Sequence, residues 1–321
     1  MLTPRENYLI AAHCGKPEWV PVFGEDANIL PPFVWDPDPD TKVDFCNVTW
    51  VSDEAGAMPD TRKPAMTDIE EWRDIIKFPD LSQVDWDRVV KDFHSQNYDP
   101  DKVTIAMANT AGIFLVPIDM MGWVDGMCAM LEEPEEYQAL IDALTDFICE
   151  YIEYLGKYIK PDIIFSGDDV AAATGPFISE ETFDTMFKKG FKQIADAIHS
   201  VGALAEFHCC GNCQWVIDKE VECGYDIAQL PVPNEDLIER MKRFKGKIAI
   251  TGGWERHGEA GKEGASEEVV RQSVHTAIDT FGKDGGLIFW DGGIICNNDE
   301  NKKKLEWLMD ELHKYGHEVY K

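Results

Sequence analysis

Apolar, β-branched runs alternate with amphipathic helical stretches from about residue 100 to the end of the chain. This alternation strongly constrains the fold, because parallel strands need helical crossovers to connect them. The strands expected are Trp19–Phe23, Val43–Val51, Val103–Ala108, Asp162–Ser166, Ala203–His208, Asp226–Gln229, Lys247–Thr251 and Gly286–Trp290. The helices expected include Glu135–Ile159, Glu180–Val201, Cys213–Cys223, Asn234–Phe244, Glu267–Phe281 and Glu300–Tyr315.

This α/β pattern predicts a distorted (β/α)8 TIM barrel with N-terminal insertions, built as a single domain over residues 1–321. A doubly wound open sheet is the alternative. No Gly-x-Gly-x-x-Gly follows an early strand, so dinucleotide binding is not indicated. Residues 52–101 are rich in Pro and Asp and poorly periodic, and we interpret them as an excursion over the barrel surface.

The composition restricts the partners and the compartment. A formal charge of −30 opposes binding to nucleic acid or to an anionic membrane surface, and it would suit a partner with a basic docking face. The chain has neither a signal-peptide pattern nor an apolar run long enough to span a membrane. Nine cysteines without small-domain spacing indicate reduced, mostly buried thiols in a cytosolic protein.

Three of the expected strands end in residues that can do chemistry. One ends in Ser166-Gly167-Asp168-Asp169 and another in His208-Cys209-Cys210, while Asp291-Gly292-Gly293 precedes Cys296. The active sites of TIM barrels lie at the carboxyl ends of the strands. The sequence therefore predicts an acidic pair, an imidazole and two thiols at one mouth of the barrel.

His208 and Cys210 point to the same side of an extended strand, and Cys209 points to the other. An imidazole beside a thiolate favours zinc, with Cys296 as the best candidate for a third ligand and the fourth position open. Glu206 shares the face of His208 and is a weaker candidate for a displaceable fourth ligand. Cys213, in a Cys-x-x-Cys sequence with Cys210, leaves a closed structural site or a redox pair as alternatives.

Only one of the adjacent residues Asp168 and Asp169 can face the mouth, and either can instead cap a helix or accept hydrogen bonds from backbone amides. Aromatic walls suit flat substrates. Three tryptophans near predicted strand or loop ends are candidates for such walls: Trp123, Trp254 and Trp290.

Several of these motifs occur together in a known order. Gly167-Asp168-Asp169, Ile178-Ser179-Glu180-Glu181, His208-Cys209-Cys210-Gly211-Asn212, Gly224-Tyr225-Asp226 and Thr251-Gly252-Gly253 resemble the uroporphyrinogen decarboxylase superfamily. The His-x-Cys-Gly-Asn sequence is similar to that of the zinc-dependent methyltransferases that work with corrinoid proteins. The resemblance covers residues 100–321 clearly and the N-terminal third loosely.

The resemblance implies zinc held by His208, Cys210 and Cys296 in a distorted barrel. It implies transfer of a methyl group between a small donor and the cobalt of a corrinoid on a separate protein. The donor expected is a methyl ether such as a methoxylated aromatic, with methanol and methylamine as alternatives. Asp168 or His257 would handle a proton on the leaving group, and Asp169 would bind substrate.

The alternative within the same superfamily is a metal-free lyase like uroporphyrinogen decarboxylase. Decarboxylases carry an arginine-rich motif at the end of the first strand, whereas this chain has Glu25 and Asp26 there. These acids would repel a substrate that bears several carboxylates. An intrinsic cobalamin-binding motif, Asp-x-His-x-x-Gly, does not occur, so the corrinoid is expected from a partner protein.

Overall fold

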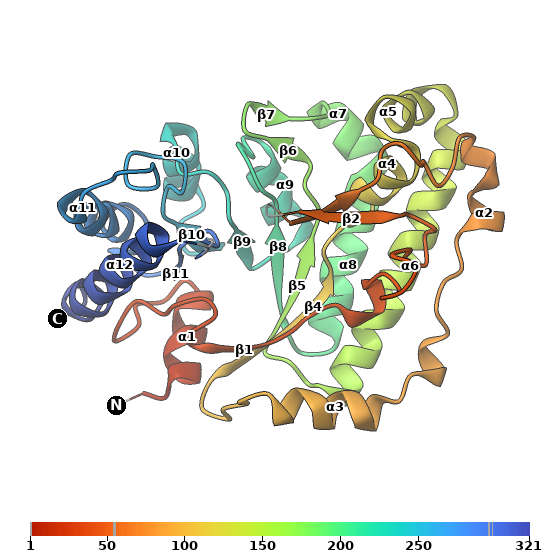
Figure 1. The fold of residues 1–321 in the computed structure, drawn as a ribbon. Coiled ribbons are helices and arrows are strands. Elements are labelled where there is room, and N and C mark those ends of the chain that lie inside the picture. Colours follow the sequence, from red (N-terminus) through yellow and green to blue (C-terminus); the bar gives the residue numbers. More distant parts are fainter. Residues whose placement is uncertain (1, 54–55, 295, 297) are drawn as a thin grey trace.

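Seven parallel strands form one curled sheet in the computed structural model, which describes residues 2–53, 56–294, 296 and 298–321 (Figure 1). Their spatial order is β1 (Ala27–Leu30), β4 (Val103–Asn109), β5 (Ile163–Gly167), β8 (Leu204–His208), β9 (Ile227–Gln229), β10 (Ala249–Gly253) and β11 (Leu287–Trp290). Short antiparallel hairpins lie outside this sheet and consist of β2 (Trp50–Asp53) with β3 (Gly56–Pro59) and β6 (Ala171–Ala172) with β7 (Gly175–Pro176).

Helices connect the strands and cover the outer face of the sheet (Figure 1). The longer ones are α1 (Pro4–Ala12), α3 (Trp86–Ser95), α5 (Trp123–Glu132), α6 (Pro134–Tyr158), α8 (Lys188–Ser200), α9 (Val216–Cys223), α10 (Glu235–Arg243), α11 (Glu267–Ala277) and α12 (Asp299–Glu318). The shorter ones are α2 (Trp72–Ile75), α4 (Leu115–Met121) and α7 (Glu180–Thr182), the 3-10 turns η1 (Phe33–Trp35), η2 (Ile69–Glu71) and η3 (Leu81–Gln83), and the π-helical segments η4 (Phe183–Phe187) and η5 (Ile278–Gly282).

The segment before β1 links the first and last strands of the sheet. The amide of Phe23 donates to the carbonyl of Phe289 at 2.9 Å, and Val22 forms a parallel bridge with Phe289. The carboxylate of Asp26 accepts the amide of Val22 at 2.8 Å, and the amide of Asp26 donates to the carbonyl of Val22 at 2.9 Å, so the chain turns directly after the bridge. The expected strand Trp19–Phe23 is therefore reduced to a bridge. The predicted α/β barrel is confirmed, and its distortion lies at this junction.

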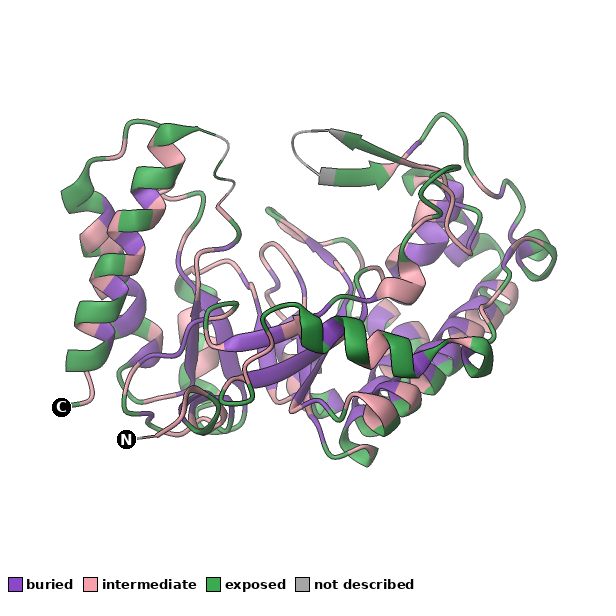
Figure 2. Ribbon diagram, turned by 60° about the horizontal axis from the view of Figure 1, so that its bottom comes forward, coloured by how far each residue is buried: buried purple, intermediate pink, exposed green. Residues whose placement is uncertain are grey.

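Side chains alternate between the barrel interior and the outer layer along the central strands. On β5, Ile163 and Phe165 join a cluster inside the barrel, whereas Ile164 packs with the helices outside. Helix α1 adds Tyr8 and Ala11 to the inner cluster. Figure 2 shows that the strands of the central sheet are mostly buried and that the helices have a buried and an exposed side. This alternation decides which residues of β8 face the interior.

The elements expected after residue 100 are present, and their ends differ by at most three residues from the prediction when η4 is counted with α8 and η5 with α11. Ser179 and Ser266 act as helix caps, since each hydroxyl accepts an amide of the first turn at 3.0 and 3.4 Å, respectively. The helix expected over Glu180–Val201 contains the π-helical segment η4.

The N-terminal third differs more from the prediction. The expected strand Val43–Val51 contains a turn, because Val43 bridges Thr49 in antiparallel fashion before β2 begins. The predicted excursion over residues 52–101 includes short helices, and α3 packs against α6. The single-domain organisation stays a prediction.

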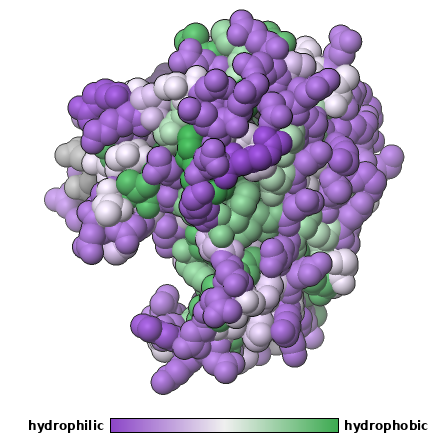
Figure 3. All heavy atoms as spheres, turned by 90° about the vertical axis from the view of Figure 1, so that its right-hand side faces the viewer, coloured by the Kyte–Doolittle hydropathy of each residue, from purple (hydrophilic) through white to green (hydrophobic). Residues whose placement is uncertain are grey.

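Polar side chains cover most of the face in Figure 3, with apolar atoms visible between them, as the strong negative charge would suggest. Within the described part of the chain, no helix is both long and apolar enough to cross a membrane.

Burial raises the pKa of Asp119, on α4, to about 7, and the negative charge of Asp44 raises it further. Because this pKa is raised in the folded state, the neutral form of Asp119 stabilises the fold below about pH 4. That stabilisation is lost as the pH rises through about 7. We therefore expect Asp119→Asn to raise the melting temperature by a few degrees near pH 8 and to change it little near pH 4.

Thermal unfolding monitored by circular dichroism at both pH values checks this expectation. Asp125→Asn, on the exposed side of the neighbouring helix α5, is the control and should show no such pH dependence. Equal melting temperatures for wild type and Asp119→Asn near pH 8 would contradict the assignment.

Candidate functional site

The site forms where β5 and β8 end. These strands pair in register, with Gly167 beside His208, and the amide of Asp168 donates to the carbonyl of His208 at 3.0 Å. The residues that follow the two strands therefore leave the sheet at one edge. Asp169 comes from the first strand and Cys210 from the second.

Asp169, His208 and Cys210 offer three ligand atoms that all lie within 4.8 Å of one another. The Sγ of Cys210 lies 3.2 Å from Nε2 of His208, and Oδ1 of Asp169 lies 3.7 Å from the same nitrogen. The amide of Cys210 also donates to Oδ1 of Asp169 at 2.7 Å. As predicted, His208 and Cys210 point the same way, whereas Cys209 is buried in the outer core.

Gly211 allows the loop after β8 to approach the β6–β7 hairpin. Its φ is +88°, and a Cβ at this position would lie 2.5 Å from the carbonyl oxygen of Ala172. The next amide, of Asn212, donates to that same oxygen at 2.9 Å. A side chain at residue 211 would therefore push the loop, and Cys210 with it, away from the hairpin.

The site disfavours charge on two of its three donors in the absence of a cation. Burial lowers the pKa of His208, although the nearby Asp169 carboxylate opposes this effect. Burial, followed by the charge of Asp169, raises the pKa of Cys210 to about 12. A bound cation would reverse this balance, because it favours the thiolate and the neutral imidazole as ligands.

This donor set fits zinc. Zinc takes imidazole nitrogen, thiolate sulfur and carboxylate oxygen in tetrahedral sites, and two such ligands of one ion lie roughly 3.5 Å apart. The distances of 3.2 and 3.7 Å around Nε2 of His208 are close to that separation. The thiol argues against magnesium and calcium, which take oxygen ligands.

A cavity of about 280 Å³ opens beside Cys210. Its walls come from the β6–β7 hairpin and from the loops after β8, β9, β10 and β11. They consist of Ala171–Ala173, Cys210, Gly211, Leu230–Pro233, Gly253–His257 and Gly292. The lining is mostly apolar, with Arg256 and His257 as its basic members. A second cavity of about 560 Å³ shares Trp254 with it.

Asp168 and Asp169 point in different directions. The Asp168 carboxylate is fully buried and accepts the amides of Phe114 and Leu115 at 2.7 and 3.0 Å. Burial raises its pKa to about 7. Asp168 thus ties the loop after β4 to β5, which matches the backbone-binding alternative considered for this pair, and Asp169 faces the metal donors.

Cys296 and Cys213 lie outside the group of three ligand atoms. Cys296 is exposed, and its sulfur lies 3.7 Å from the carbonyl oxygen of Ile294. Both of its neighbours in the chain, residues 295 and 297, are outside the described residues. The buried Cys213 thiol donates to the carbonyl of Cys209 at 3.3 Å. The role of Cys296 as a ligand and the exclusion of Cys213 both stay predictions.

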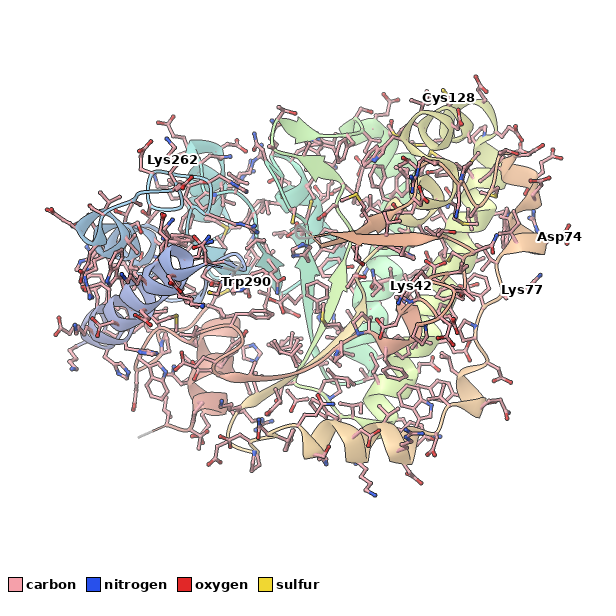
Figure 4. All side chains as sticks on the ribbon, in the orientation of Figure 1. Lys42, Asp74, Lys77, Cys128, Lys262 and Trp290 are labelled. Atoms are coloured by element: carbon pink, nitrogen blue, oxygen red, sulfur yellow. The ribbon has the colours of Figure 1, made fainter. Side chains whose placement is uncertain are left out.

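The three tryptophans occupy different surroundings. Trp254 is buried, lines the cavity beside Cys210 and donates from Nε1 to Ser273 at 2.8 Å. Trp290, at the end of β11, packs on Phe23 with ring centroids 4.9 Å apart (Figure 4). Trp123 is 44% exposed on α5 and packs on Phe177. Of the three, the structure brings Trp254 together with Cys210.

The sequence does not predict the positions of three further residues, which lie beside the metal donors or in the cavity lining. Asp169 was assigned to substrate, and its position near His208 depends on the turn after β5. Arg256 lies in the cavity lining, and its guanidinium donates to the carbonyl of Gly292 at 2.9 Å. Gln229, at the end of β9, contacts His208. The only sequence signal for Gln229 was a polar residue at a strand end.

Comparison with solved structures supports the fold. The chain resembles a methyltransferase from Methanosarcina mazei with a TM-score of 0.68 and 14% identity, over 98% of this chain and 99% of that chain. A D-psicose 3-epimerase from Clostridium cellulolyticum H10 has a TM-score of 0.38 and 8% identity, over 73% of this chain and 80% of that chain. This TM-score is too low to support a conclusion about fold or function. A search of curated protein sequences finds no match.

The family comparison agrees with the resemblance in the sequence motifs. The model described as Uroporphyrinogen decarboxylase (URO-D) matches residues 46–315. This range includes the strands that carry Asp169, His208 and Gln229. Because the match spans well over half of the sequence, the chain belongs to the uroporphyrinogen decarboxylase family.

Proposed function

We propose that this protein is a cytosolic, zinc-dependent methyltransferase that moves a methyl group between a small donor and the cobalt of a corrinoid carried by a separate protein. The observation that carries the proposal is the pair His208 and Cys210, with donor atoms 3.2 Å apart at the mouth of the barrel. Both residues belong to the His-x-Cys-Gly-Asn sequence.

The proposed ligands are His208 and Cys210, with two candidates for the third. Asp169 already lies in the group of donor atoms. Cys296 follows β11, whose carboxyl end faces the same mouth, and a second thiolate would suit zinc better than a carboxylate. Zinc bound here would act as a Lewis acid on the heteroatom of the donor.

The surrounding residues would bind the donor and exclude water. Leu230, Val232 and Trp254 give the cavity an apolar wall next to Cys210, and Trp254 offers a flat face to an aromatic ring. His257 lies in the same lining and is the better-placed of the two predicted groups to transfer a proton, because Asp168 is committed to backbone amides.

The cavity favours one donor class. An apolar pocket of about 280 Å³ suits a methoxylated aromatic better than methanol, which would leave most of the space to water. Glu255 and Arg256 line this cavity together, so its charges do not select a donor class, and the apolar walls carry the argument. A methyl ether on an aromatic compound is therefore the donor that we propose.

Metal analysis is the first test. Protein purified without chelator should contain about one zinc per chain, as a three-ligand catalytic site requires. His208→Ala and Cys210→Ala should lose most of that zinc. Comparison of Asp169→Asn with Cys296→Ala identifies the third ligand, because only its removal should lower the zinc content. Unchanged zinc in both His208→Ala and Cys296→Ala would show that the proposed ligand set is wrong.

The two cysteines of the Cys-x-x-Cys sequence form a matched pair of substitutions. Cys213→Ser should keep both zinc and activity, because the Cys213 thiol contacts backbone carbonyls and lies outside the donor group. Cys210→Ser should lose activity. Zinc content and turnover are measured for both variants. Loss of zinc from Cys213→Ser would instead indicate a closed structural site.

The reaction itself is tested with a reduced corrinoid protein. The enzyme alone should be inert towards every donor, and turnover should appear only when a cobalt(I) corrinoid partner is added. The absorbance change from cobalt(I) to methyl-cobalt(III) reports the transfer. Release of carbon dioxide from a porphyrinogen by zinc-free protein would overturn the proposal in favour of the metal-free lyase.

A further inference from the structure

We infer that Gln229 is a positioning residue that fixes the tautomer of His208, and that Glu206 and Thr251 in turn fix the amide of Gln229. The inference rests on the metal-binding role of His208 in the proposed function. It assigns a task to three buried polar residues of the barrel interior that neither the family match nor the metal donors explain.

The three residues form one chain of hydrogen bonds that ends at His208. Oε1 of Gln229 lies 2.9 Å from Nδ1 of His208. Nε2 of Gln229 donates to Oε1 of Glu206 at 3.1 Å, and the hydroxyl of Thr251 donates to the same oxygen at 2.5 Å. Gln229, Glu206 and Thr251 are each at most 2% exposed.

The sheet places these side chains next to one another. Gln229 on β9 pairs with His208 on β8 and with Thr251 on β10, and Glu206 precedes His208 by two residues. Strand alternation therefore directs all four side chains to the same side of the sheet, towards the interior. The chain of hydrogen bonds is therefore a consequence of the strand register.

The polarity of the chain determines where the proton of His208 lies. Oε1 of Glu206 accepts the hydroxyl of Thr251 and also accepts from the Gln229 amide, so the side of that amide that faces Glu206 is its NH2 group. The amide oxygen then faces His208, and an oxygen cannot donate. Nδ1 of His208 must therefore carry the hydrogen, which leaves the lone pair on Nε2, the nitrogen 3.2 Å from Cys210.

This arrangement matters because a nitrogen that carries a hydrogen cannot ligate a metal. Ligating histidines generally donate their other N–H to an oxygen, and removal of that oxygen typically weakens metal binding by about 10- to 100-fold. Here the oxygen belongs to a neutral amide instead of a carboxylate. Gln229 thus orients the ring while it separates the imidazole from the carboxyl group of Glu206.

The tautomer is measured in metal-free protein with ¹⁵N-labelled histidine. The ¹⁵N shifts of His208, assigned by the signal that is missing in His208→Ala, should show a protonated Nδ1 and an unprotonated Nε2. In Gln229→Leu, which keeps the size of the side chain but has no acceptor, this pattern should be lost. The zinc dissociation constant of that variant, from competition with a chelator, should rise by about 10- to 100-fold.

Gln138→Leu is the matched control, because Gln138 on α6 also donates to a carboxylate but lies away from the metal donors. It should change neither the tautomer nor the zinc affinity. Thr251→Val provides a second variant if Gln229→Leu does not fold, and it should shift both readouts in the same direction but less. The inference is overturned if wild-type His208 carries its proton on Nε2. It is equally overturned if a folded Gln229→Leu variant retains the Nδ1 proton and binds zinc within about threefold of wild type.

These measurements are independent of the proposed reaction. The tautomer is observed without zinc, donor or corrinoid partner, so an intact pattern in a protein that transfers no methyl group would refute the proposed function alone.

Discussion

The in-register pairing of β5, β8 and β9 is the constraint on which the candidate site depends. It places Gly167 beside His208 and His208 beside Gln229, so that three strand ends meet at one edge of the sheet. Backbone hydrogen bonds set this register, and a shift of one residue would turn every side chain of β8 to the opposite face. His208 would then lie among the helices, and Cys209 would take its place in the interior.

The same register concentrates polar groups where burial is costly. Glu206 lies inside the barrel with one carboxylate oxygen that has no partner among the described residues, and burial raises its pKa to about 7. Such a residue reduces the stability of the fold, so its presence here calls for another purpose. Support of Gln229, and through it of His208, is a purpose that this geometry satisfies. The buried polar residues thus lower the stability of the interior and at the same time hold His208 in one orientation at the mouth of the barrel.

Strand periodicity allowed much of the fold and the centre of the site to be predicted from the sequence. The alternation of β8, continued for two residues beyond His208, brings His208 and Cys210 together and separates Cys209 from them. Features that depend on turns were not predictable in this way. The choice between Asp168 and Asp169 depends on which carboxylate the amides after β4 bind, and the turn from Val22 to Asp26 depends on hydrogen bonds between these two residues. The contact of Gln229 with His208 could not be predicted either, because it depends on β9 being the neighbour of β8 in the sheet.

The two adjacent aspartates show how one turn separates a structural task from a chemical one. Asp168 directs its charge to backbone amides and thereby holds the loop after β4. Asp169 directs its charge to the amide of Cys210 and to the edge of His208. A negative charge at this point makes the thiolate harder to form, yet the same charge would attract a divalent cation. The site is therefore unfavourable for an ionised Cys210 alone and favourable for Cys210 bound to a metal.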